Sequence, residues 1–207
     1  MRRLSSFYAG ILAIVMTLGA DTAMAIEEPK FTIVSQSQEF EIRKYGDRLA
    51  VEAVQTGGEN AAFRKLFRYI SGDNQAQGKI AMTAPVTQSA PQSETVAMTA
   101  PVTQSMSNGA QVMRFFLPAS YSATTAPQPT DPALRLVTVS GGYFAVRVYS
   151  GRSTDANFAK NAKQLLDNLA ANGIQPKGAP IKATYNGPFT PFFLRRNEVM
   201  VPISAPN

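Results

Sequence analysis

The chain has 207 residues, of which 44% are apolar and 16% are charged, and its formal net charge is +6. This composition is typical of a globular protein with a substantial core and argues against disorder. The chain contains neither Cys nor His, which excludes thiol nucleophiles, disulfides, iron–sulfur clusters, Cys/His zinc sites, His general bases and any His ligand to a metal. The basic residues are scattered, so we interpret the positive surplus as solvated surface and expect no nucleic-acid partner.

Residues 1–25 have the pattern of a secretory signal peptide. Two arginines near the start precede an apolar run over residues 7–18, and residues 23–25 (Ala-Met-Ala) match the small-x-small pattern at which signal peptidase cuts. The run is shorter than the roughly 20 residues that span a bilayer. We therefore expect cleavage after Ala25, with residues 26–207 released to the periplasm or secreted without a stable membrane anchor. An uncleaved anchor is the alternative.

Three short runs rich in β-branched and aromatic residues follow the signal segment. They predict strands over residues 31–35, 40–45 and 49–55. Gly46 and Asp47, between the second and third runs, favour a tight hairpin turn.

Residues 60–70 predict an amphipathic helix. Its apolar residues recur at i, i+3, i+4 and i+7, which places them on one face: Phe63, Leu66, Phe67 and Ile70. Burial of such side chains contributes about 1.5–3 kcal/mol each, so most of this face is predicted to be core.

A nine-residue segment, Ala-Met-Thr-Ala-Pro-Val-Thr-Gln-Ser, occurs at residues 81–89 and again at residues 97–105. Its alternating Met and Val predict two short strands, each interrupted by a Pro that cannot donate a ladder hydrogen bond. The loop between them covers residues 89–95. The Thr and Met side chains could line a ligand pocket, and the alternative is that they only turn and pack the chain.

The second half of the chain has the same order of elements. Strands are predicted over residues 134–139 and 144–149, joined at Gly141-Gly142, and then over residues 181–185 and 199–203. A helix fits between the two strand pairs, with an N-cap at Thr154 or Asp155 and a C-cap signal at Asn172-Gly173. The apolar face of this helix comprises Phe158, Ala162, Leu165, Leu166 and Leu169.

The two halves look like copies of one structural unit. A shift of 95 residues aligns Val51 with Val146 and Phe63 with Phe158. We therefore predict a duplicated strand–strand–helix–strand–strand unit, over about residues 31–117 and 133–204, whose sheets pack together with both helices outside in one α+β domain. A Pro-rich stretch would cross between the halves, and division into two domains is the alternative, although each would then bury little surface.

Several segments, in the right order, resemble the SOUL haem-binding family, and the resemblance spans about residues 31–203. The matching segments are 79–86 (Lys-Ile-Ala-Met-Thr-Ala-Pro-Val, the family signature), 40–54 (opening hairpin), 63–72 (first helix), 113–118 (aromatic strand) and 195–199 (C-terminal signature). The family fold that this implies is a distorted antiparallel β-barrel or double sheet flanked by two helices.

The resemblance also implies non-enzymatic binding of haem or another tetrapyrrole. The site would be a hydrophobic groove between the first helix and the loop before the C-terminal strand. Phe side chains there would stack on the macrocycle, and arginines would pair with propionates in bidentate geometry. The contacts implied by the resemblance are Phe63, Phe67, Arg68 and Ile70 on the helix, and Phe189, Phe192, Phe193, Arg195 and Arg196 in the loop. Arg64 is a further candidate partner for a propionate.

The absence of His departs from the family pattern, because some relatives are thought to hold iron through a His. Tyr69, Met82 and Met98 are candidate iron ligands by chemistry and location. The alternative is that the protein binds only the porphyrin face, in which case metal-free porphyrin binds about as well as haem. No separate metal site is expected.

Three other functions compete with tetrapyrrole binding. The same groove could take another apolar anionic small molecule, or the protein could be an envelope module that binds a protein partner. A hydrolase or isomerase is disfavoured because the carboxylates are spread over strands and loops without a pair spaced for acid–base work. The glycine patterns of dinucleotide-binding and phosphate-binding loops are absent from the sequence.

Overall fold

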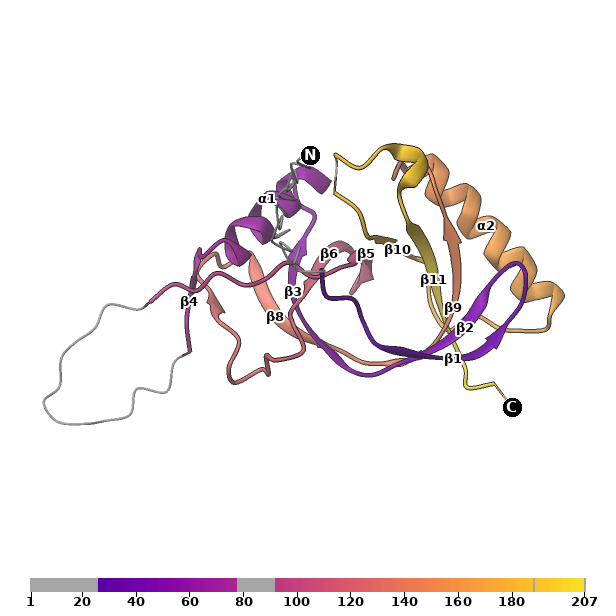
Figure 1. Ribbon diagram of the computed structural model, residues 1–207, viewed down its shortest axis with the longest axis horizontal. Helices are drawn as coiled ribbons and strands as arrows, with labels where there is room; N and C mark the ends of the chain where they lie inside the picture. The colour runs from indigo at the N-terminus through magenta and orange to yellow at the C-terminus, as the bar shows by residue number, and fades with distance from the viewer. Residues whose placement is uncertain (1–25, 78–91, 188, 207) are drawn as a thin grey trace, which may run out of the picture.

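The computed structural model of the chain describes residues 26–77, 92–187 and 189–206. Its main feature is a nine-stranded antiparallel sheet that curls into a half-barrel (Figure 1). In chain order the strands of this sheet are β1 (Phe31–Gln36), β2 (Glu41–Tyr45), β3 (Arg48–Val54), β5 (Val102–Ser107), β6 (Ala110–Phe116), β8 (Leu134–Val139), β9 (Gly142–Tyr149), β10 (Ile181–Thr184) and β11 (Asn197–Ile203).

Smaller elements complete the fold. Two helices, α1 (Glu59–Ile70) and α2 (Asp155–Ala171), pack against the two halves of the sheet, and a short 3₁₀ turn, η1 (Phe192–Leu194), precedes β11. A second sheet pairs β4 (Asn74–Gln75) with β7 (Gln128–Pro129). The α+β architecture with a barrel-like sheet and two helices, predicted from the sequence, is confirmed.

The sheet consists of two halves with the same connectivity. Its strand order is β1-β2-β9-β11-β10-β5-β6-β3-β8. Strands β3, β6 and β5 of one half therefore correspond to β9, β11 and β10 of the other, and β5 pairs with β10 at the centre. Each half is completed by a strand from the other half of the chain, because β8 pairs with β3 and β2 pairs with β9.

This exchange of strands overturns the hairpin predicted at Gly46 and Asp47. β2 pairs with β1 and β9, whereas β3 pairs with β6 and β8, so the turn at Gly46 and Asp47 joins strands of different halves. The same is true of Gly141 and Gly142, which join β8 to β9. The sequence predicted each strand from its local pattern, but the pairing is long-range and turn residues alone do not reveal it.

The two connections between the halves cross in direct contact. The backbone N–H of Gly141 donates to Oδ1 of Asp47 at 2.7 Å. A Cβ at Gly141 would lie 2.3 Å from the carbonyl oxygen of Tyr45 and 2.5 Å from the carbonyl carbon of Gly46. Real Cβ atoms do not approach backbone this closely, so glycine is required at this crossing.

The alignment by 95 residues is wrong for the strands. Val51 packs in the core under α1, whereas Val146 lies in the cluster on the face of the sheet away from α2. Ala145, one residue earlier, packs in the core under α2 and therefore lies on the face that corresponds to that of Val51. Because side chains alternate between faces, a slip of one residue exchanges the core face for the opposite one.

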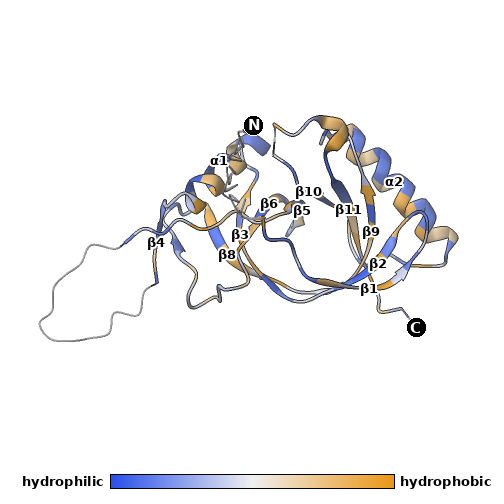
Figure 2. Cartoon of the chain, viewed as in Figure 1, coloured by the Kyte–Doolittle hydropathy of each residue, from blue (hydrophilic) through white to orange (hydrophobic). Residues whose placement is uncertain are grey.

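The buried face of α1 differs in part from the prediction. Leu66 and Ile70 are buried as expected, but Phe67 is 48% exposed and Tyr69 is fully buried. Helix α1 contacts the sheet along a stripe centred on Leu66 and Tyr69, which leaves Phe67 at the edge of the contact. Figure 2 shows hydrophobic and hydrophilic residues alternating around both helices, as expected for helices that cover a sheet.

Helix α2 begins and ends where the sequence indicated. The side chain of Thr154 accepts a hydrogen bond from the backbone N–H of Asn157, so Thr154 is the N-cap. Asn172 is the C-cap, and Gly173 follows with φ +70°, a conformation that glycine adopts readily.

The segment between the halves and the duplicated segment both contact α1. Ala126, in the Pro-rich crossing, is fully buried, and the carbonyl of Pro127 accepts a hydrogen bond from the Tyr69 hydroxyl at 2.8 Å. The first copy of the nine-residue repeat lies outside the described residues. In the second copy β5 begins at Val102, directly after Pro101. The prediction of a strand interrupted by this proline is therefore wrong, because the proline precedes the strand.

We predict that Gly141→Ala lowers the free energy of unfolding by at least about 2 kcal/mol, because the new methyl group would overlap the backbone of the other connection. Gly46→Ala is the matched control: it lies at the same crossing, but nothing stands within 4 Å of the position that its methyl group would take. Urea unfolding followed by circular dichroism measures both. Equal stability of the two variants would contradict the close crossing.

Candidate ligand-binding site

A groove of about 440 Å³ lies between α1 and the loop that follows β10. In Figure 1 this helix and this loop face each other across the opening of the half-barrel. Helix α1 contributes Phe63 and Phe67, the second copy of the repeat contributes Met98 and Val102, and the loop contributes Phe189. Its volume is within the range of about 300–1,000 Å³ that small-molecule sites usually have.

Two phenylalanines form a flat apolar wall on the α1 side of the groove. The rings of Phe63 and Phe67 are stacked, with centroids 6.1 Å apart and planes inclined by 13°. Their i, i+4 spacing on a helix brings them side by side. The edge of the Phe63 ring contacts Phe115 of β6, at 5.3 Å between centroids, which fixes the inner end of the wall. The wall suits the face of a planar aromatic ligand.

The polar end of the groove is already satisfied by contacts within the protein. Glu59 is the one charged residue among the described residues that line it. Its carboxylate accepts a hydrogen bond from the Gln104 amide at 2.6 Å and lies 3.8 Å from the ammonium group of Lys182. Lys182 is buried and also pairs with Asp155 at 3.3 Å. The groove therefore offers apolar contact inside, and the anionic edge of a ligand would point outward.

The structure brings only part of the predicted site together. Phe63, Phe67 and Phe189 line the same groove, as the sequence predicted for a shared slot. Arg68 does not line this groove, and it is 3.9 Å from Asp73 and 3.5 Å from Asp131. With Arg64 and the two phenylalanines of the wall, it lines an adjoining hollow of about 350 Å³.

Three predicted contacts follow the groove loop in the chain but are not part of the groove lining. Phe193 is exposed within η1. The Nε of Arg195 donates to the carbonyl of Thr190 at 2.7 Å, inside the loop. Arg196 stacks on the ring of Tyr185 at 3.9 Å and belongs to a buried network around Glu198. Their contact with a ligand stays a prediction.

The three candidate iron ligands have different surroundings. Tyr69 is fully buried, its hydroxyl donates to the carbonyl of Pro127, and burial raises the pKa of the phenol well above its ordinary value. Iron binding would require that this hydroxyl lose both its proton and its partner. Met98 lines the groove and is partly exposed. Met82 lies outside the described residues.

The buried ion network occupies the concave face of the sheet beside the groove. Glu198 is fully buried and accepts hydrogen bonds from Arg43 at 3.1 Å, from Arg196 at 2.7 Å and from the Tyr185 hydroxyl at 2.7 Å. Burial and then the Glu198 charge raise the pKa of Tyr185. Burial alone would lower the pKa of Arg43, but its hydrogen bond with Tyr45 and the Glu198 charge outweigh this and raise it. The raised pKa values mean that Tyr185 and Arg43 keep their protons near neutral pH.

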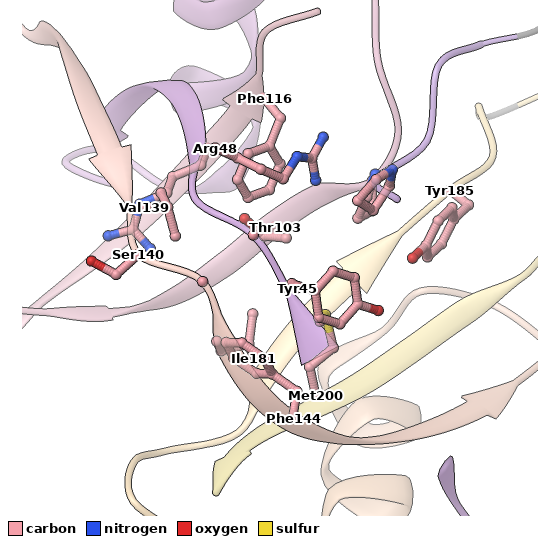
Figure 3. Close-up of a pocket in the computed structure, with 15 residues that line it drawn as sticks. Tyr45, Arg48, Thr103, Phe116, Val139, Ser140, Phe144, Ile181, Tyr185 and Met200 are labelled. Atoms are coloured by element: carbon pink, nitrogen blue, oxygen red, sulfur yellow. The ribbon is translucent and has the colours of Figure 1, made fainter. Parts of the chain in front are cut away.

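A second hollow lies in the concave face and is too small for a large ligand. It measures about 60 Å³ and is lined mainly by apolar side chains, among them Phe116, Phe144 and Met200. Figure 3 shows the Arg48 side chain along the Phe116 ring, at 3.8 Å from guanidinium carbon to ring centroid. Typical ligand pockets start at about 300 Å³, so this hollow is too small. A larger hollow, of about 600 Å³, is lined by several charged residues, among them Glu27, Glu28 and Asp47. The groove beside α1, with its mainly apolar lining, is therefore the candidate site.

Two features are absent from the part of the chain that the structure describes. Within residues 26–77, 92–187 and 189–206, no group of three or more His, Cys, Asp or Glu residues could hold a metal ion. Over the same residues, no helix combines the length and apolar character needed to cross a membrane.

Sequence reasoning missed several residues that line the groove. Ile26, Ser153 and Asn186 come from three distant segments, and no pattern in the sequence places them together. The repeat was a usable signal, because its second copy contributes Met98, Thr99, Ala100, Val102 and Gln104 to the lining. The pocket-lining interpretation of the repeat thus describes the geometry of that copy.

Comparison with known proteins gives one family and a set of distant structural neighbours. The sequence pattern of the SOUL heme-binding protein family matches residues 26–202, most of the chain. No curated protein matches the chain. The C-terminal domain of EcmrR has a similar structure, with a TM-score of 0.56 and 7% identity over 81% of this chain and 98% of that one.

A protein from Listeria innocua that is described as a hydrolase has a TM-score of 0.51 and 10% identity, over 83% of this chain and 94% of its own. An uncharacterized conserved protein from Listeria innocua has the same TM-score and identity, over 82% and 94%. At these identities the likeness shows a shared fold alone.

We predict that Glu198→Gln lowers the free energy of unfolding by about 3–5 kcal/mol, because it leaves two arginines beside a buried neutral amide. Glu39→Gln is the matched control, since Glu39 also pairs with an arginine, Arg147, at 2.8 Å but is exposed. Exposed pairs contribute about 0–1 kcal/mol. Urea denaturation midpoints compare the two, and a loss for Glu198→Gln no larger than for Glu39→Gln would contradict the role of the network.

Proposed function

This chain belongs to the SOUL heme-binding protein family, and on that basis we propose that it binds haem or a related tetrapyrrole, without catalysis, in the groove beside α1. The observation that carries the proposal is the stacked pair Phe63 and Phe67, which presents a flat apolar wall inside a groove of about 440 Å³. A tetrapyrrole is planar and apolar over both faces and carries its carboxylates at one edge. The flat apolar wall and the apolar lining of the groove are complementary to the two faces of such a macrocycle.

The charges of the groove determine how such a ligand would lie. Glu59 inside the groove would repel a propionate, although Lys182 offsets part of its charge. The propionates would therefore point out of the groove toward solvent. Arg64 is exposed on α1, three residues before Phe67, and is placed to meet a carboxylate at that rim.

Phe189 supplies the second contact in this arrangement. Its side chain is 99% exposed although it borders the groove. No residue that the structure describes covers this ring, so it is accessible to a ligand that enters the groove. In our proposal Phe189 covers the face of the macrocycle that the α1 wall leaves open.

We also propose that the protein acts in the cell envelope after removal of residues 1–25. The support is the charged start, the apolar run and the cleavage pattern of that segment.

Hemin and metal-free protoporphyrin should bind the chain from residue 26 onward in one-to-one complexes. Their affinities should lie within about tenfold of each other, or about 1.4 kcal/mol. Titrations followed by hemin absorbance and by protoporphyrin fluorescence measure both, in protein without a His tag. Phe67→Ala should weaken both about tenfold or more through lost stacking and apolar contact.

Val148→Ala is the matched control, because Val148 is equally exposed, at 50%, on β9 and is not a groove residue. If neither compound binds saturably, the proposed function is wrong, and the same groove would be tested with other apolar anions. Binding of hemin alone would show that an iron bond, and not the macrocycle face, gives the affinity.

Tyr69→Phe should lower the free energy of unfolding by about 1 kcal/mol, through loss of the buried hydrogen bond to Pro127. Hemin affinity should not change, because the hydroxyl is turned into the core. A change in the hemin absorption spectrum or a tenfold loss of affinity in this variant would instead identify Tyr69 as the iron ligand.

A further inference from the structure

The segment between β10 and β11 displays a cluster of large apolar side chains to solvent. Phe189 is 99% exposed, Phe192 49%, Phe193 63% and Leu194 65%. The last three are consecutive and form η1. Consecutive residues in a tight turn point in different directions, so no single protein surface beneath them could bury all three.

The turn that carries these residues is held in place by hydrogen bonds. The backbone N–H of Leu194 donates to the carbonyl of Pro191 at 2.9 Å, and the N–H of Gly151 donates to the carbonyl of Phe192 at 3.0 Å. The Phe192 and Phe193 rings also meet edge to face, with centroids 5.5 Å apart. The apolar side chains are thus presented on a fixed turn.

The proposed ligand does not account for this exposure. The groove beside α1 is bordered by Phe189 but not by the residues of η1. A tetrapyrrole in the groove would therefore leave Phe192, Phe193 and Leu194 uncovered. A separate partner is needed to bury them.

The charge around the turn is positive. Between Ala183 and Glu198 the sequence contains no acidic residue and two adjacent arginines, of which Arg196 is neutralised by Glu198 and Glu28. A third arginine, Arg152, places its guanidinium 5.5 Å from the centroid of the Phe192 ring. The whole chain also carries a net charge of +6. An apolar tip with arginines at its base is complementary to a surface that is apolar inside and anionic outside.

We propose that η1 and the two arginines beside it that stand outside the Glu198 network, Arg152 and Arg195, dock on an anionic lipid bilayer. Phe193 and Leu194, the most exposed residues of η1, enter the interfacial region, where aromatic and aliphatic side chains are buried while the arginines remain among the phosphate groups. Docking in this way requires neither a spanning helix nor a tetrapyrrole. It also brings Phe189 and the mouth of the groove close to the bilayer surface.

The test is co-sedimentation of the chain from residue 26 onward, which contains all described elements and lacks the apolar run of residues 7–18, with lipid vesicles. We expect binding to phosphatidylcholine vesicles that contain phosphatidylglycerol, weakened by salt, and much weaker binding to phosphatidylcholine alone. Phe193→Ser combined with Leu194→Ser should lower the partition coefficient at least about tenfold, because binding scales with buried apolar area.

Ile33→Ser combined with Val34→Ser is the matched control, since these are also adjacent exposed apolar residues, at 49% and 44%, on β1. This pair should bind vesicles like the unaltered protein, and thermal unfolding should show both double variants folded. The proposal is overturned if the unaltered protein binds neither kind of vesicle, if both double variants lose binding equally, or if anionic lipid has no effect. Because no tetrapyrrole is present, failure here leaves the proposed function standing, and the reverse also holds.

Discussion

The contact between the two crossing connections is the constraint on which the rest of this structure depends. The β2–β3 connection and the β8–β9 connection pass each other at backbone contact, with Gly141 against Tyr45 and Gly46. The crossing sends β2 into the second half and β8 into the first, so each half is completed by the other. Neither half of the chain could then complete its part of the sheet alone. The groove follows from this, because α1 of the first half and the β10–β11 loop of the second are held on opposite sides of one opening (Figure 1).

The sequence predicted the elements well because the signals for them are local. Strands and helices came from residue patterns of period two and 3.6, and the caps of α2 from Thr154 and Gly173. The prediction of strand pairing was wrong because pairing is long-range. A turn at Gly46 has the same local sequence whether the next strand pairs with the preceding one or joins the other half of the sheet. The 95-residue alignment failed at Val51 because a shift of one residue along a strand moves every side chain to the opposite face of the sheet.

The residues that line the groove were predicted only in part, again because local patterns are visible in the sequence and long-range contacts are not. Phe63 and Phe67 follow from helical spacing, and the resemblance supplied the facing loop with Phe189. Burial could not be read from spacing, so the sequence did not reveal that the Tyr69 hydroxyl bonds to Pro127 in the core. Nor did it reveal that Asp73 and Asp131 lie beside Arg68. Contact of either residue with a ligand stays a prediction.

The structural neighbours separate what the fold provides from what this chain adds to it. Proteins described as a hydrolase and as a domain of EcmrR share the architecture at 10% and 7% identity, so the curled sheet and its opening are common property, and function must reside in side chains. Here those side chains divide the concave side by polarity. The charged groups of the network around Glu198 are bonded to one another, while the aromatic wall of the groove remains accessible to a ligand. A polar ligand would gain little from either region, whereas a flat apolar one gains the whole Phe63–Phe67 wall. The division therefore favours ligands recognised by shape and apolar area over ligands recognised by charge.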